Sequence, residues 1–80
     1  MNKIELQERL SLEKIPTNVY SLNGGLPNER LCLGEVSGKW EVYYSERGDK
    51  SDLMIFDKET DACKYFYNRL REILKSSRLI

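Results

Sequence analysis

The sequence contains no histidine, and its thirteen basic residues are balanced by thirteen acidic ones. Because histidine is the side chain that most often exchanges protons near neutral pH, its absence argues against acid–base catalysis and therefore against an enzyme. Zero net charge argues against attraction of nucleic acid or lipid through the overall field. No apolar run approaches the ~20 residues that a membrane span needs, and Met1 leads directly into charged sequence instead of a signal peptide. We therefore expect a cytoplasmic protein that does not associate with membranes.

Cysteine is also scarce, since only Cys32 and Cys63 occur. In a cytoplasmic protein such isolated thiols are typically reduced and packed as small apolar residues. Without histidine or a Cys-x-x-Cys pair, the sequence has no recognisable set of zinc ligands. It also lacks the glycine-rich and nucleophile motifs of nucleotide-binding proteins and hydrolases. We expect no metal, no cofactor and no catalytic residue.

Eighty residues are enough for one small domain, 1–80. Its charges are sorted along the chain. From Glu41 to Asp61 seven acids face three bases, a net charge of −4, whereas from Ala62 to Ile80 five bases face one acid, a net charge of +4. This sorting is compatible with pairing within the domain or with one oriented partner.

The clearest structural pattern lies in residues 39–45, which include the only tryptophan. Trp40, Val42 and Tyr44 alternate with polar residues and Tyr43, and this predicts a half-buried strand. A second strand is predicted over 31–36, with Ser37 and Gly38 as a two-residue turn between the two.

The length of this turn sets the register of the predicted hairpin. Leu33 should lie opposite Val42, and Cys32 opposite Tyr43. The apolar side chains then meet on one face of the sheet and the small or polar ones on the other, so turn and pattern agree.

The remaining elements follow from local signals. Helix formers predict a helix over about 3–12, which ends before Pro16. A short strand within 19–22 is followed by a glycine-rich stretch, which we interpret as a hairpin loop. The alternative, a phosphate-binding loop, would need more glycines, a lysine and a following helix, and here a strand comes next. A polar turn over 46–52 leads to a strand over 53–56, and an apolar stripe over 62–74 predicts a core-facing helix.

This order predicts an α+β fold. We expect a two-layer sandwich in which a three- to four-stranded antiparallel meander is flanked by an N-terminal and a C-terminal helix (α-β-β-β-β-α). Trp40 should lie under the helices beside Phe66 and Leu70. The face covered by the helices is predicted to carry Leu31, Leu33, Trp40, Val42, Tyr44, Leu53 and Ile55, and the open face Cys32, Gly34, Glu41, Tyr43, Met54 and Phe56.

The open face and the polar turn form the predicted partner-binding surface. An exposed tyrosine and a methionine inside an acidic rim suit the centre of a protein interface. The residues predicted to bind the partner are Glu41, Tyr43, Glu46, Asp49, Asp52 and Met54.

The alternative is a small regulatory or nucleic-acid-associated module. It would use the basic helix face of Lys64, Arg71, Lys75 and Arg78, with an exposed Tyr65 available for stacking on a base. The zero net charge disfavours nucleic acid as a partner.

Several strings in the sequence resemble a known family. They are Leu22-Asn23-Gly24-Gly25 with Pro27-Asn28-Glu29, then Trp40-Glu41-Val42-Tyr43-Tyr44-Ser45-Glu46-Arg47-Gly48, then Phe56-Asp57 and Ala62-Cys63-Lys64-Tyr65-Phe66. They resemble a small Gram-positive family of immunity proteins encoded beside polymorphic secreted toxins, and the similarity covers roughly 16–70. The resemblance implies a protein that neutralises a cognate secreted bacterial toxin by stoichiometric binding and occlusion. It assigns no toxin-contacting residues and leaves the oligomeric state open.

Overall fold

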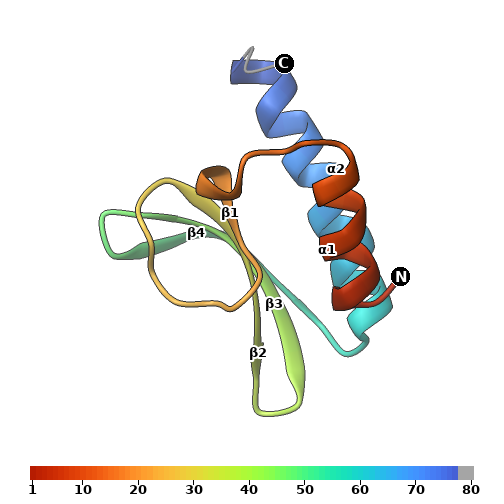
Figure 1. Cartoon of the computed structure of the whole chain (residues 1–80). Coiled ribbons are helices and arrows are strands. Elements are labelled where there is room, and N and C mark those ends of the chain that lie inside the picture. Colours follow the sequence, from red (N-terminus) through yellow and green to blue (C-terminus); the bar gives the residue numbers. More distant parts are fainter. Residues whose placement is uncertain (78–80) are drawn as a thin grey trace.

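A computed structural model of the chain describes residues 1–77. It contains an N-terminal helix, a four-stranded mixed sheet and a C-terminal helix, so the predicted α+β fold is confirmed (Figure 1). The elements are α1 (Lys3–Leu12), the single 3-10 turn η1 (Thr17–Val19), β1 (Tyr20–Ser21), β2 (Arg30–Val36), β3 (Lys39–Glu46), β4 (Asp49–Phe56) and α2 (Glu59–Ser77).

Helix α1 has the predicted bounds because both of its ends are capped. The side chain of Asn2 accepts a hydrogen bond of 2.8 Å from the backbone N–H of Glu5, and the Glu5 carboxylate accepts one of 3.0 Å from the N–H of Asn2. At the other end Lys14 has a positive φ of 57°, and the N–H of Ile15 donates to the carbonyl of Leu10 at 3.1 Å. These bonds satisfy backbone groups that the helix leaves without partners.

The central hairpin has the predicted register. Strands β2 and β3 are antiparallel, with Leu33 opposite Val42 and Cys32 opposite Tyr43. The prediction is wrong for β1, which pairs with β2 in parallel. The segment 23–29 is therefore not a hairpin loop, because the chain must return to the end of the sheet from which β1 started.

Strand β4 starts earlier than predicted. The turn before it has only two residues, Arg47 and Gly48, and their φ values of 51° and 80° are the left-handed pair that a tight hairpin favours. Within the strand, the pairing with β3 shifts between Val42 and Tyr44, and Asp52 opposite this shift has a φ of 54°. This is a β-bulge.

The faces predicted for β4 are consequently reversed. Met54 pairs with Val42, and Phe56 pairs with Trp40, so both lie on the face covered by the helices. Ile55 pairs with Glu41 and lies on the other face.

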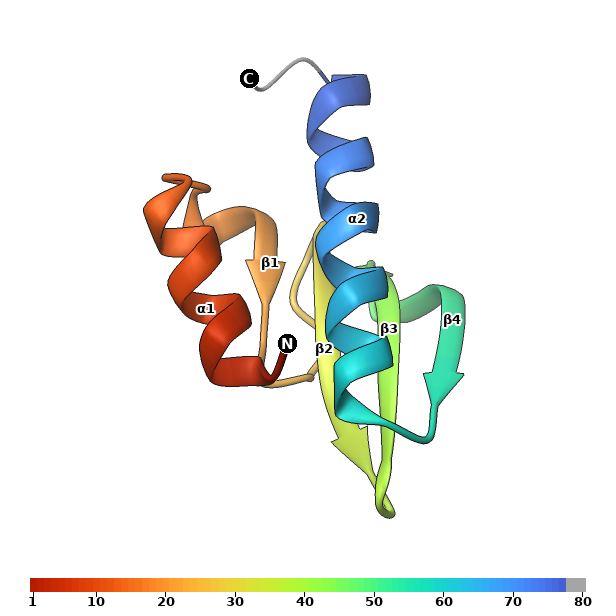
Figure 2. The same cartoon turned by 90° about the vertical axis from the view of Figure 1, so that its right-hand side faces the viewer.

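The hydrophobic core lies between the sheet and α2, with α1 beside α2 at the β1 side (Figure 2). The rings of Tyr20 and Phe66 meet edge to face, with centroids 6.4 Å apart. Trp40 packs against this core but is only partly buried, so the core is centred on fully buried aliphatic residues and Phe66 and not on Trp40. These central residues are Leu6, Leu10, Leu33, Val42, Phe66 and Leu70.

Tyr65 is not exposed as predicted. It is partly buried, and its ring lies against Phe56 with centroids 5.4 Å apart. Neither α1 nor the described part of α2 is long and apolar enough to cross a membrane.

Candidate partner-binding surface

Glu46 and Asp49 occupy the two positions that flank the turn between β3 and β4. They pair with each other across the hairpin, and both are exposed. Because Arg47 and Gly48 form the whole turn, these two carboxylates are held close together at the tip of the hairpin. This part of the predicted surface is present as two neighbouring exposed acids.

Glu41 and Tyr43 lie on the face away from the helices, but this face is not open at Tyr43. Only 2% of Tyr43 is exposed, and its hydroxyl donates a hydrogen bond of 2.6 Å to the carbonyl oxygen of Gly25. The loop between β1 and β2 thus covers the sheet on the side opposite the helices (Figure 1). The expectation that Tyr43 supplies exposed contact area is wrong.

Lys50, on β4, contacts both Tyr43 and Glu41. Its ammonium lies 4.6 Å from the centroid of the Tyr43 ring and 3.1 Å from a carboxylate oxygen of Glu41. Burial raises the pKa of Tyr43 to about 12. Glu41 and Tyr43 are therefore engaged within the domain, in an ion pair and a cation–π contact.

Asp52 and Met54 lie beside a groove between β4 and α2. Asp52 is at the bulge, and one of its carboxylate oxygens is 3.7 Å from the guanidinium of Arg69. Met54 is 43% exposed, on the face covered by the helices. The groove has a volume of about 470 Å³ and is lined by Asp52, Leu53, Met54, Tyr65, Asn68, Arg69 and Glu72.

The six predicted residues therefore do not form one patch. Glu41 and Tyr43 lie on one side of the sheet, whereas Met54 points to the other, and Glu46 and Asp49 are at the hairpin tip. The exposed members Asp49, Asp52 and Met54 lie on strand β4, the outer strand of the sheet, and Glu46 at the end of β3 pairs with Asp49.

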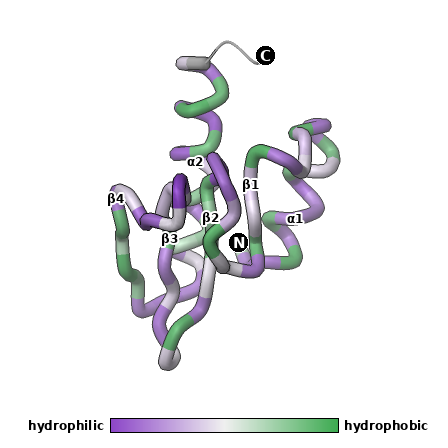
Figure 3. The backbone as a smooth tube through the Cα atoms, turned by 90° about the vertical axis from the view of Figure 1, so that its left-hand side faces the viewer, coloured by the Kyte–Doolittle hydropathy of each residue, from purple (hydrophilic) through white to green (hydrophobic). Residues whose placement is uncertain are grey.

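Sequence reasoning missed two exposed members of this strand. Leu53 and Ile55 were assigned to the core but are 43% and 57% exposed. Figure 3 shows the resulting continuous apolar segment along β4. The signal for it was the unbroken apolar run 53–56, which has no polar alternation and so does not specify which side faces the core.

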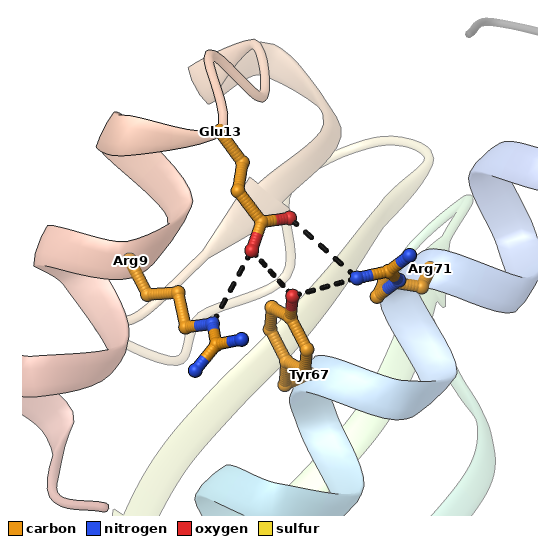
Figure 4. Close-up of polar contacts among 4 residues, drawn as sticks. All are labelled: Arg9, Glu13, Tyr67 and Arg71. Atoms are coloured by element: carbon orange, nitrogen blue, oxygen red, sulfur yellow. Dashed lines mark hydrogen bonds and ion pairs between the residues drawn. The ribbon is translucent and has the colours of Figure 1, made fainter.

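A second polar cluster joins the two helices (Figure 4). The Tyr67 hydroxyl donates a hydrogen bond to Glu13, and Arg71 donates one of 2.8 Å to the Tyr67 oxygen. Arg9 donates one of 3.3 Å to the Glu13 carboxylate, and its guanidinium lies 4.9 Å from the centroid of the Tyr67 ring. The hydrogen bond from Tyr67 is the chief cause that lowers the pKa of Glu13. This cluster ties α1 to α2.

The cluster also bears on the basic helix face of the alternative interpretation. Arg71 is held by Tyr67 and is 3.9 Å from Glu13, so its charge is partly compensated within the domain. Arg78 lies outside the described residues. Nucleic-acid binding therefore stays a prediction.

The two thiols are buried and unpaired, as predicted. Burial raises the pKa of Cys63 to about 11, and it also raises the pKa of Cys32. Over residues 1–77, no three side chains of the metal-ligating kinds lie close enough to hold a metal ion.

Comparisons of the chain with protein-family models, with curated proteins and with solved structures gave no match.

Proposed function

We propose that this chain is an immunity protein, which neutralises a cognate secreted toxin by direct stoichiometric binding in the cytoplasm of the producing cell. The observation that supports a binding role best is the outer strand β4, where exposed apolar side chains at Leu53, Met54 and Ile55 adjoin exposed acids. An apolar centre with a polar rim is the usual anatomy of a protein interface. The resemblance of the 40–48 stretch to immunity proteins supplies the class of partner.

Inhibition by occlusion requires only that the inhibitor has a complementary surface of sufficient area. A typical interface buries about 800 Å² on each partner, which is about a seventh of the 5490 Å² exposed by this domain. A domain of this size can therefore cover the mouth of an active site. Toxins that act on nucleic acids or nucleotides commonly need a basic cleft, and the acids at the hairpin tip would complement it.

The test is binding to the secreted protein encoded next to this gene. We expect a one-to-one complex by calorimetry, together with rescue of growth when the two proteins are co-expressed. The double variant Glu46→Lys with Asp49→Lys should bind more weakly while melting at the same temperature, because both side chains are exposed at the tip of the hairpin.

A charge-reversed pair on α2, Lys64→Glu with Lys75→Glu, is the matched control. Both lysines are exposed, and unlike Arg71 neither belongs to the cluster that ties α2 to α1. If the α2 pair abolishes binding and the hairpin pair does not, the interface has been placed on the wrong side. If the wild-type protein neither binds the toxin nor rescues growth, the proposed function is refuted.

A further inference from the structure

The two edges of the sheet differ strongly. In the order β1-β2-β3-β4, the first edge strand has two residues and the last has eight. An edge strand presents backbone N–H and C=O groups along its outer side, and these can pair with a strand from another chain. Within the described part of the chain, β4 is the longer template for such an addition.

The side chains of β4 provide apolar surface on both faces of this edge. Met54 projects on the helix side, next to the groove of about 470 Å³ that continues onto α2. Ile55 projects on the other side and is 57% exposed. Because successive side chains of an added strand would point to opposite faces, both of its rows would find apolar contacts here.

The charge around this edge is acidic. Glu46 and Asp49 lie at one end, and Asp52 and Glu72 lie beside the groove. Arg69 is 3.7 Å from each of the last two, so it compensates only part of their charge. With Arg47 at the turn and the Lys50–Glu41 ion pair beside the edge counted as well, five acids face three bases, a net charge of −2.

We infer that β4 accepts an extended strand of the partner protein, in which apolar side chains are flanked by lysine or arginine. The inference deepens the proposed function and rests on it for the identity of the partner. The acidic rim favours a basic segment by charge complementarity.

A second copy of this chain is a poorer occupant of the edge. Pairing β4 with β4 would bring together two sets of acids with the same sign. Charged side chains on an edge strand are one of the features that disfavour pairing with an edge of the same charge.

The first experiment titrates isotope-labelled protein at low salt and follows its backbone amide resonances. The probe is a synthetic peptide in which valine and threonine alternate between two lysines at each end. We expect saturable shifts confined to residues 49–56 and to the side of α2 that lines the groove. The same peptide with glutamates in place of the lysines should bind at least about tenfold more weakly.

Two variants form a matched pair in this titration. Ile55 and Val36 are both exposed β-branched residues on strands, at 57% and 51%. Ile55→Lys should weaken binding of the lysine peptide about tenfold, because it removes apolar contact and adds a like charge. Val36→Lys, at the end of β2, should leave the affinity within about twofold. Both variants should melt close to the wild type.

The other outcomes overturn either this inference or the proposed function on which it rests. Absence of saturable binding, equal affinity for the two peptides, or shifts centred on α1 would show that β4 is not the docking edge. A dimer in sedimentation that Ile55→Lys dissociates would make a second copy the occupant. A toxin complex that is unaffected by Ile55→Lys would refute strand addition and leave the inhibitor function standing. Failure of the wild type to bind the toxin would refute the proposed function, and the peptide titration would still decide the edge.

Discussion

The hydroxyl of Tyr43 donates a hydrogen bond of 2.6 Å to the carbonyl oxygen of Gly25 and so joins β3 to the loop between β1 and β2. The loop can lie flat on the sheet because glycine is present on both sides of the contact. A Cβ atom added to Gly34 would come within 3.3 Å of the Cα of Gly24. A side chain on Gly34 would crowd this approach, whereas Gly24 has a φ of 66°, a conformation that residues with side chains rarely adopt.

Removing this hydrogen bond should loosen the loop. We expect Tyr43→Phe to lower the free energy of unfolding by about 1 kcal/mol and to speed the reaction of Cys32, which lies opposite Tyr43 and is fully buried. Urea denaturation and thiol labelling measure the two effects. Tyr65→Phe, which keeps the ring contact with Phe56, is the control. An unchanged labelling rate in Tyr43→Phe would mean that the loop stays closed without this bond.

The hydrogen bond between Tyr67 and Glu13 should make the free energy of unfolding depend on pH in the acidic range. The pKa of Glu13 is lowered, chiefly by the hydrogen bond from Tyr67, below its ordinary value of 4.5. A lowered carboxyl pKa contributes stability above the pKa of the unfolded chain, and this contribution is lost as the pH falls through the folded pKa. Wild type should therefore lose stability below about pH 4.5, and Tyr67→Phe should lose less. Parallel curves of unfolding free energy against pH for the two proteins would contradict this.

The buried thiols should react slowly in the folded protein. Burial raises the pKa of Cys63 to about 11 from an ordinary value of 9.0, so the nucleophilic thiolate is suppressed at neutral pH. Labelling with a disulfide reagent should be slow for both Cys32 and Cys63 and should become fast when denaturant is added. Rapid labelling of Cys63 in the native state would refute this burial.

The core assignment predicts an order of stability losses. Leu70→Ala should cost about 2–5 kcal/mol, because Leu70 is fully buried against the sheet. Trp40→Ala should cost less than Leu70→Ala, because Trp40 is only partly buried at the periphery of the core. Ile55→Ala should stay within about 0.5 kcal/mol of the wild type. Denaturant midpoints of the three variants give this order directly. If Trp40→Ala is the least stable of the three, the assignment of Trp40 to the periphery of the core is wrong.

The central hairpin was predictable because two independent local signals agree on it. The turn at Ser37 and Gly38 permits one register, and the alternation in 31–36 and 39–45 places apolar side chains together in that same register. Helix α1 was predictable for a similar reason. Helix formers predict the helix, and the proline that follows at position 16 predicts that it ends before that residue. The acids at the hairpin tip follow from the sequence as well.

Strands β1 and β4 depended on contacts that no local pattern encodes. A strand of two residues is too short to specify the direction in which it pairs, and its parallel pairing with β2 follows from the path of the glycine loop across the sheet. In β4 all four residues of 53–56 are apolar, so alternation could not say which of them face α2. The pairing of Met54 with Val42 decides it.

The same distinction, between local sequence and tertiary contacts, applies to the candidate partner-binding surface. The sequence by itself determined which acids and apolar residues lie near the β3–β4 turn, because they are neighbours along the chain. Only the tertiary structure decided that Tyr43 is covered and that Ile55 is exposed. Tyr43 lies under a loop whose contacting residue, Gly25, is eighteen residues earlier in the chain, and the face of Ile55 is set by cross-strand pairing beyond the bulge at Asp52. Side-chain exposure at an edge strand is a property of its neighbours in space, and those are chosen by burial of the whole core.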